Sequence, residues 1–179
     1  MRERDRTSTR RNIETLQALA DAFNRRDDSV VASLMHPEVA FHSACFENKT
    51  YLGSAGVAQY RADVDGAWSR WRLEDYRFLD AGNDRVLQLY RLSGIGRGSG
   101  APVQQEAAIL WRLRAGKVVA GRAFLNRSEA LKAAGLEQGS VSSPGASLRF
   151  HGTTAREHCQ PLGIESQRNC RCDRQHPAA

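Results

Sequence analysis

The feature of this sequence that most constrains its fold is a run of four strand-like segments in the second half of the chain. Each segment is rich in apolar and aromatic residues, and turn-forming residues or glycines separate it from the next. Strands that follow one another through short turns pair as antiparallel neighbours, so these segments predict one antiparallel sheet. The four predicted strands are residues 71–79, 85–93, 103–113 and 118–125.

Helical patterns precede this sheet, and their order gives the fold class. Apolar residues at spacings of three and four predict an amphipathic helix that begins near Ile13. Because helices come before the strands rather than alternating with them, we predict an α+β fold with helices on one side of the sheet. The other predicted elements are a helix over 30–35 that ends at His36-Pro37, a strand over 39–46, a helix that begins at Ser54, and a helix over 129–134 that ends at Gly135.

Large apolar side chains are confined to the middle of the chain. Residues 13–137 hold all three Trp, all four Tyr and five of the six Phe. This stretch has the length of a common single domain, about 125 residues. Residues 138–179 are rich in Gly, Ser, Pro, Arg, His and Cys and cannot bury enough apolar surface to fold, so they are predicted to be a disordered tail. Residues 1–12 are predicted to be a loose basic arm.

The positive charge of the chain lies mainly outside the predicted domain. The net charge is +6, of which residues 1–12 carry +3 and residues 138–179 carry +2. A nearly neutral body argues against a nucleic-acid-binding domain. No apolar run is long enough to span a membrane, and the charged N-terminus has no apolar stretch behind it. We therefore predict a cytoplasmic protein that binds neither membrane nor nucleic acid.

Neither a metal nor a cofactor is predicted. Three of the four cysteines lie in the tail, where Cys159, Cys170 and Cys172 match no standard zinc spacing, and the chain has no disulfide framework. The glycine-rich segment 94–100 lies between two predicted strands. Since no helix follows it, it lacks the helix N-terminus that a phosphate cradle requires.

Several segments, in their order along the chain, carry a family resemblance. They are residues 23–27 with 34–39, residues 53–57, the hairpin 111–119, and residues 122–131 leading into 133–136. Over residues 13–137 the sequence resembles the SnoaL-like group of the nuclear transport factor 2 superfamily, which is related to polyketide cyclases, ketosteroid isomerases and limonene-epoxide hydrolases. Residues 122–131 and 133–136 resemble the C-terminal end of the domain in bacterial members of this group. The resemblance implies a cone-shaped, cystatin-like α+β roll, in which a curved antiparallel sheet packs on N-terminal helices, encloses an apolar pocket and forms homodimers through its outer face.

Two enzyme chemistries implied by the resemblance fit this sequence poorly. A steroid-isomerase-like site needs a carboxylate base, a neutral acid and a tyrosine, but rough alignment places Ser43, Ile109 and Leu19 at these positions. An epoxide-hydrolase-like site needs an Asp–Arg–Asp arrangement that holds a water molecule. Arg122 and Glu106 supply part of it, and a second interior carboxylate is missing.

A cyclase-like site needs one carboxylate or histidine near the mouth of the pocket, and His42 and Glu106 are the candidates. His42 has an intrinsic pKa suited to proton transfer near neutral pH; the alternative is an outer-face residue that contacts water or a dimer partner. For Glu106, the alternative to a catalytic role is a position exposed to solvent or at an interface. Arg122 is a candidate for binding an anionic group, or for a salt bridge to Glu106.

The aromatic residues predict either a pocket for a flat hydrophobic molecule or ordinary core packing. We predict a small-molecule-binding domain, with a cofactor-independent cyclase, isomerase or epoxide-hydrolase-like enzyme as the alternative. The predicted pocket residues are Phe41, Ser43, Tyr60, Trp68, Trp71, Tyr90, Ile109 and Trp111.

Overall fold

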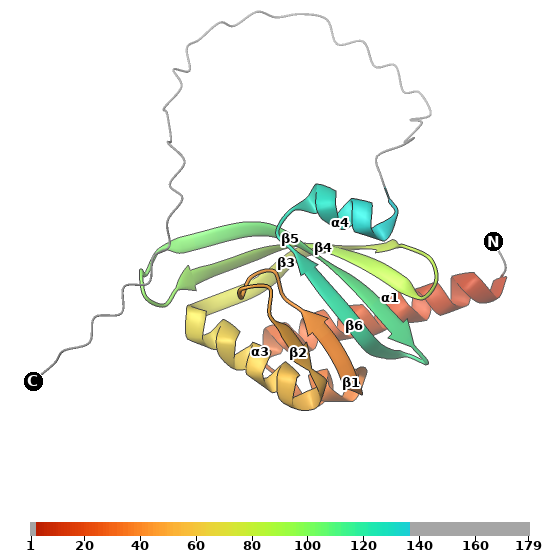
Figure 1. Ribbon diagram of the computed structural model, residues 1–179, viewed down its shortest axis with the longest axis horizontal. Helices are drawn as coiled ribbons and strands as arrows, with labels where there is room; N and C mark the ends of the chain where they lie inside the picture. The colour runs from red at the N-terminus through yellow and green to blue at the C-terminus, as the bar shows by residue number, and fades with distance from the viewer. Residues whose placement is uncertain (1–2, 137–179) are drawn as a thin grey trace, which may run out of the picture. The chain divides into compact units, whose positions relative to one another are not determined.

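A computed structural model of the chain describes residues 3–136. Its elements are α1 (Glu3–Arg25), α2 (Asp28–Leu34), β1 (Met35–His42), β2 (Thr50–Leu52), α3 (Gly53–Ala67), β3 (Trp68–Asp80), β4 (Arg85–Gly96), β5 (Pro102–Arg114), β6 (Lys117–Phe124) and α4 (Arg127–Ala134). The strands form one curved, unclosed sheet in the order β2-β1-β6-β5-β4-β3 (Figure 1). The predicted α+β class is confirmed. Neighbouring strands are antiparallel except β1 and β6, which pair in parallel.

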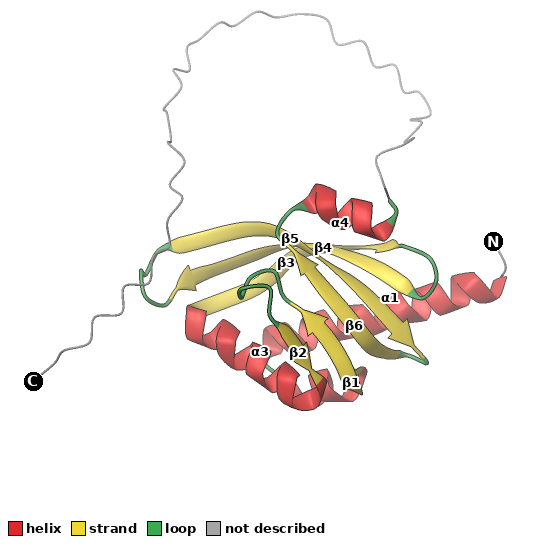
Figure 2. Cartoon of the chain, in the orientation of Figure 1, coloured by secondary structure: helices red, strands yellow, loops and turns green. Residues whose placement is uncertain are grey.

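Helices cover both faces of the sheet (Figure 2). A separate hydrophobic core lies between the sheet and the helices on each face. The first three helices pack on the inner face, and α4 packs on the outer face through Ala130 and Ala134. β4 is therefore buried on both sides: Val86 and Tyr90 face the inner core, while Leu87 faces the outer one. This arrangement corrects the expectation that all helices lie on one side.

The first helix begins earlier than predicted. The structure places residues 3–12 in α1, so the loose arm is wrong for this part of the chain. Ser8 and Thr9 donate hydrogen bonds to Asp84 and Asp80, at 3.3 and 3.0 Å, and Asn12 is buried. Polar contacts hold the first turns of α1 in place. The spacing of apolar residues, on which the predicted start of the helix is based, does not detect such contacts. The predicted tail and its cysteines lie outside the described residues.

The ends of several other elements also differ from the expectations. β1 begins at Met35 and ends at His42, and the short strand β2 was not predicted. α3 begins at Gly53, one residue before the predicted start, and Ser54 does not cap it. α4 has Asn126 as its N-cap and ends at Gly135 as predicted, and Gly135 has a left-handed conformation (φ 74°).

Asp63 on α3 fastens β2 and the preceding loop to the helix. Its carboxylate accepts hydrogen bonds from Tyr51 (2.6 Å), Gln59 (2.7 Å) and Lys49 (3.0 Å). The hydrogen bonds from Tyr51, Gln59 and Lys49 lower the pKa of Asp63 to about 2. Burial, together with the hydrogen bond to Asp63 and the charge of Asp63, raises the pKa of Tyr51.

The lowered pKa of Asp63 predicts a pH-dependent contribution to stability. It is present above the unfolded-state pKa of about 4 and is lost as the pH falls towards 2. We expect Asp63→Asn to unfold at lower urea concentration than the wild type at pH 6, with the gap shrinking between pH 4 and pH 2. Urea unfolding followed by circular dichroism measures this. In a Tyr51→Phe background, which lacks one hydrogen bond to Asp63, the stability difference that Asp63→Asn causes should disappear at a higher pH. A difference that is undiminished at pH 2 would show that the lowered pKa of Asp63 is not its cause.

Candidate functional site

A small apolar cavity lies between α1, α3 and the inner face of the sheet. Its volume is about 40 Å³. A space of this size holds a water molecule, whereas an engineered cavity that binds benzene measures about 150 Å³. The walls are apolar or aromatic except for one amide, that of Gln88. The lining residues are Leu19, Ala20, Phe23, Met35, Phe41, Val57, Tyr60, Leu73, Gln88, Ile109 and Trp111.

A cleft of about 170 Å³ adjoins this cavity, between α2, α3 and the start of β1. Phe23, Met35 and Val57 line both spaces and therefore form the wall between them. The cleft also has polar groups on its walls, including Asp28 and Arg61. Movement of the three shared side chains would join the cleft to the cavity.

Gln88 is the polar side chain on the wall of the cavity, and it is only 2% exposed. The indole nitrogen Nε1 of Trp111 donates a hydrogen bond to Gln88 Oε1 at 2.8 Å. Gln88 Nε2 is buried and has no hydrogen-bond partner. Gln88, whose Nε2 has no partner, thus lies on the wall of a mostly apolar cavity.

Tyr60 brings its aromatic ring to the same cavity. It packs against Phe41, Tyr51 and Phe23, at ring-centroid distances of 4.7, 5.2 and 6.0 Å. Burial, with smaller contributions from Tyr90, Cys45 and Tyr51, raises the pKa of Tyr60 well above its usual value. Burial thus disfavours the phenolate form of Tyr60.

A charged network fixes the helices around the cleft. Arg61, with only 10% of its side chain exposed, forms ion pairs with Asp28 (3.3 Å) and Asp65 (3.1 Å). Its guanidinium also lies over the rings of Phe23 and Trp71. Burial raises the pKa of Asp65, but hydrogen bonds from Trp71 and Arg61 and the charges of Arg61 and Arg26 outweigh it and lower the pKa. Arg61 thereby ties α2 and α3 to the start of β3.

Half of the predicted pocket residues line the cavity. These four are Phe41, Tyr60, Ile109 and Trp111. Of the others, Ser43, Trp71 and Tyr90 are buried elsewhere in the core and Trp68 is half-buried at the start of β3.

The three predicted catalytic candidates lie away from the cavity. His42 pairs with Thr50 through a hydrogen bond of 3.0 Å between Nδ1 and Oγ1. Arg122 is exposed and lies over Phe124, which belongs to the outer core. Glu106 is exposed, and it forms no ion pair with Arg122 in the described part of the chain.

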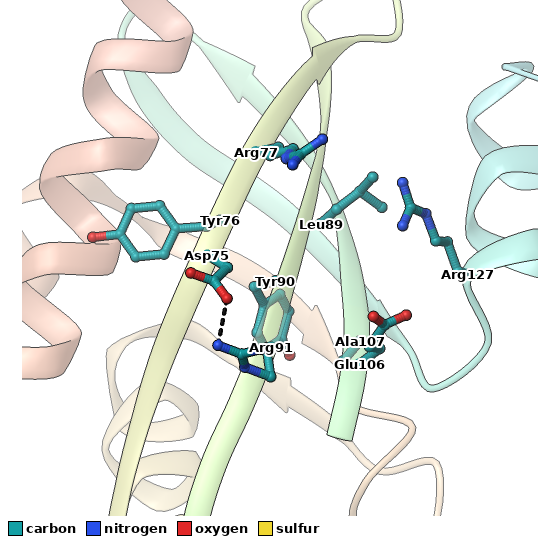
Figure 3. A pocket seen from close by; sticks show the side chains of 9 residues that line it. All are labelled: Asp75, Tyr76, Arg77, Leu89, Tyr90, Arg91, Glu106, Ala107 and Arg127. Atoms are coloured by element: carbon teal, nitrogen blue, oxygen red, sulfur yellow. Dashed lines mark ion pairs between the residues drawn. The ribbon is translucent and has the colours of Figure 1, made fainter. Parts of the chain in front are cut away.

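Glu106 instead lines a wider hollow of about 590 Å³ near the start of α4 (Figure 3). Arg91 forms ion pairs here with Asp75 and, at 3.7 Å, with Glu74. The hollow is open and its charged groups are partly paired with one another. It therefore lacks the enclosed apolar walls typical of small-molecule sites. Its lining residues are Asp75, Tyr76, Arg77, Leu89, Tyr90, Arg91, Glu106, Ala107 and Arg127.

Sequence reasoning missed Gln88 and Arg61. Gln88 is the one polar residue in the run from Val86 to Tyr90, and a lone amide in a buried strand is a signal that was available. Arg61 had no such signal, because a charged residue on a helix is usually solvated. Among residues 3–136, no group of three or more His, Cys, Asp or Glu side chains is placed to hold a metal ion, and no helix is long and apolar enough to cross a membrane.

Comparison with protein families agrees with this architecture. The model of the SnoaL-like domain matches residues 16–121, which is more than half of the chain. The chain belongs to the SnoaL-like domain family. The match includes the residues of α1, β1, α3 and β5 that line the cavity. No curated protein matches this SnoaL-like protein in sequence.

Solved structures with the same fold cover most of the SnoaL-like domain. A candidate polyketide cyclase from Xanthomonas campestris pv. campestris is 19% identical, with a TM-score of 0.60 over 71% of this chain and 98% of that one. An NTF2-like protein of unknown function from Burkholderia pseudomallei K96243 is 20% identical, with a TM-score of 0.59 over 68% and 95%. TerC, co-crystallised with polyporic acid, is 23% identical, with a TM-score of 0.59 over 70% and 98%. At these identities the likeness shows the fold alone.

Proposed function

We propose that this SnoaL-like protein binds a small, mostly apolar molecule in the cavity between α1, α3 and the sheet. The observation that carries the proposal is the enclosure of an apolar, aromatic-walled space next to a cleft, with a wall of three side chains between them. Ligand sites are typically concave and apolar with a few placed polar groups, and Gln88 supplies such a group here. The co-crystallisation of the related TerC with polyporic acid supports small-molecule binding by this fold.

The size of the cavity determines how a ligand enters. At about 40 Å³ the cavity has no room for a ring. A ring compound fits when Phe23, Met35 and Val57 move and the cavity merges with the cleft. Met35 suits this movement because an unbranched thioether side chain adapts easily to new shapes.

A binding role agrees better with the cavity walls than the enzymatic alternative does. No Asp, Glu, His, Lys or Cys lines the cavity, and burial raises the pKa of Tyr60, which disfavours the phenolate form. A cyclase-, isomerase- or epoxide-hydrolase-like reaction would have to use the groups of the cleft. There Asp28 is paired with Arg61, and Nδ1 of His36 accepts a hydrogen bond from the backbone N–H of Glu38.

Enlarging Val57 tests the site of binding. Val57→Phe adds a ring to the wall between cavity and cleft, so we expect it to weaken binding by at least about tenfold. Ala55→Phe is the matched control, since Ala55 is exposed on the same helix and lines neither space. Mass spectrometry of small molecules that co-purify with the three proteins gives the ligand. A ligand retained equally by Val57→Phe would rule out this site.

The homodimer implied by the family resemblance, and the cytoplasmic location, stay predictions. The outer face is partly covered by α4, and its uncovered part carries exposed polar residues such as Arg112 and Arg122. Light scattering of the purified protein tests the dimer, for which we expect twice the chain mass of 19.9 kDa.

A further inference from the structure

The amide of Gln88 has one orientation that satisfies its neighbour. The indole N–H of Trp111 can only donate a hydrogen bond, so the group facing it at 2.8 Å must be the amide oxygen Oε1. This contact leaves the two N–H donors of Nε2 directed elsewhere. They find no acceptor within the protein, although Gln88 is only 2% exposed.

Trp111 is itself held in place, so the amide is pre-oriented. Its ring stacks on Phe41 at a centroid distance of 5.7 Å. Gly121 lies directly beside both rings, and a Cβ atom there would come within 2.5 Å of Trp111 and 2.8 Å of Phe41. The absence of a side chain at this position lets the indole approach β6 closely. A fixed indole then fixes Gln88.

A buried, unused donor favours a ligand that carries an acceptor. Buried polar groups are paired in the great majority of proteins, because an unpaired one costs free energy. An anion is disfavoured, since the remaining walls of the cavity are apolar and would not offset its desolvation. A neutral acceptor on an apolar body fits both the amide and the walls.

We propose that Gln88 selects the ligand, by donating through Nε2 to a carbonyl oxygen of a small neutral ring compound. The inference rests on the function proposed above, because it requires the cavity to be the binding site. The flat aromatic surfaces of Phe41, Trp111 and Tyr60 face the body of the ring. A single water molecule is the competing acceptor, and the cavity has room for one.

A pair of ligands with the same shape tests the proposal. Acetophenone carries a carbonyl oxygen at the position where α-methylstyrene carries a methylene group. We expect the wild-type protein to bind acetophenone more tightly by about tenfold to a hundredfold, as a single paired or unpaired buried donor implies. Gln88→Met removes the donors of Nε2, but it also removes the acceptor of the Trp111 indole N–H. In a Trp111→Phe background, which lacks that indole donor, Gln88→Met should lower the preference to about twofold or less. Gln104→Met, at an exposed position of β5, should keep it.

A second measurement does not depend on any variant folding. In nitrogen-15 spectra of the wild-type protein, the side-chain amide protons of Gln88 should move further downfield with acetophenone than with α-methylstyrene, because only acetophenone accepts a hydrogen bond from Nε2. Equal affinity for both compounds would mean that water satisfies the amide, and would overturn the role of Gln88 while leaving the binding function standing. A preference that Gln88→Met leaves unchanged in the Trp111→Phe background would overturn it as well. Absence of binding by both compounds would overturn this inference together with the proposed function.

Discussion

Gly121→Ala is expected to destabilise the protein by about 2–3 kcal/mol, which is large for the addition of one methyl group. The new Cβ would lie 2.5 Å from a ring carbon of Trp111 and 2.8 Å from Phe41. Neither ring can yield easily, because Phe41 and Trp111 are both at most 5% exposed and pack in the central core. Urea unfolding followed by tryptophan fluorescence measures the change.

Gly66→Ala is the matched control for this substitution. Gly66 lies within α3, and a Cβ there meets no atom within 4 Å. Alanine is a better helix former than glycine, so Gly66→Ala should raise the free energy of unfolding by about 0.5–1 kcal/mol. If both variants changed stability in the same direction, the close approach of Gly121 to the two rings would not be the cause.

Arg61→Met is expected to cost about 2 kcal/mol. Removing one member of a buried ion pair is strongly destabilising, but the partners here are partly exposed and solvent compensates part of the loss. Asp28 and Asp65 have 72% and 33% of their side chains exposed. The substitution also removes the guanidinium from the faces of Phe23 and Trp71. We expect a melting temperature lower by about 5–10 °C in differential scanning calorimetry.

The control for Arg61 is Arg72→Met, at an exposed position of β3. It removes the same charge and should leave the melting temperature within about 2 °C of the wild type. Equal losses from the two substitutions would point to net charge rather than to the network at the cleft.

Much of the fold was predictable because its strands are long and follow one another. β4, β5 and β6 lie close to their predicted ranges, since turns mark their ends. β2 has only three residues, too few for a detectable pattern. The parallel pairing of β1 with β6 joins strands far apart in the chain, and no local signal encodes it.

The site was less predictable than the fold. Phe41, a predicted pocket residue of β1, is buried in the core, whereas His42, the predicted catalytic candidate next to it, pairs with Thr50. β4 is buried on both faces, so its apolar run gave no indication of which residues face the cavity. Gln88 was therefore passed over. Glu106 and Arg122 were considered for their chemistry, and the structure leaves both exposed to solvent.

The central claim is that the inner cavity binds a small apolar molecule, and methyl NMR tests it most directly. With the methyl groups of isoleucine and methionine labelled, acetophenone should shift the signals of Ile109 and Met35, which line the cavity. The signal of Ile95, at the far end of β4, should stay in place. Shifts confined to Ile95, or shifts of Ile109 and Met35 that persist unchanged in Val57→Phe, would contradict the account.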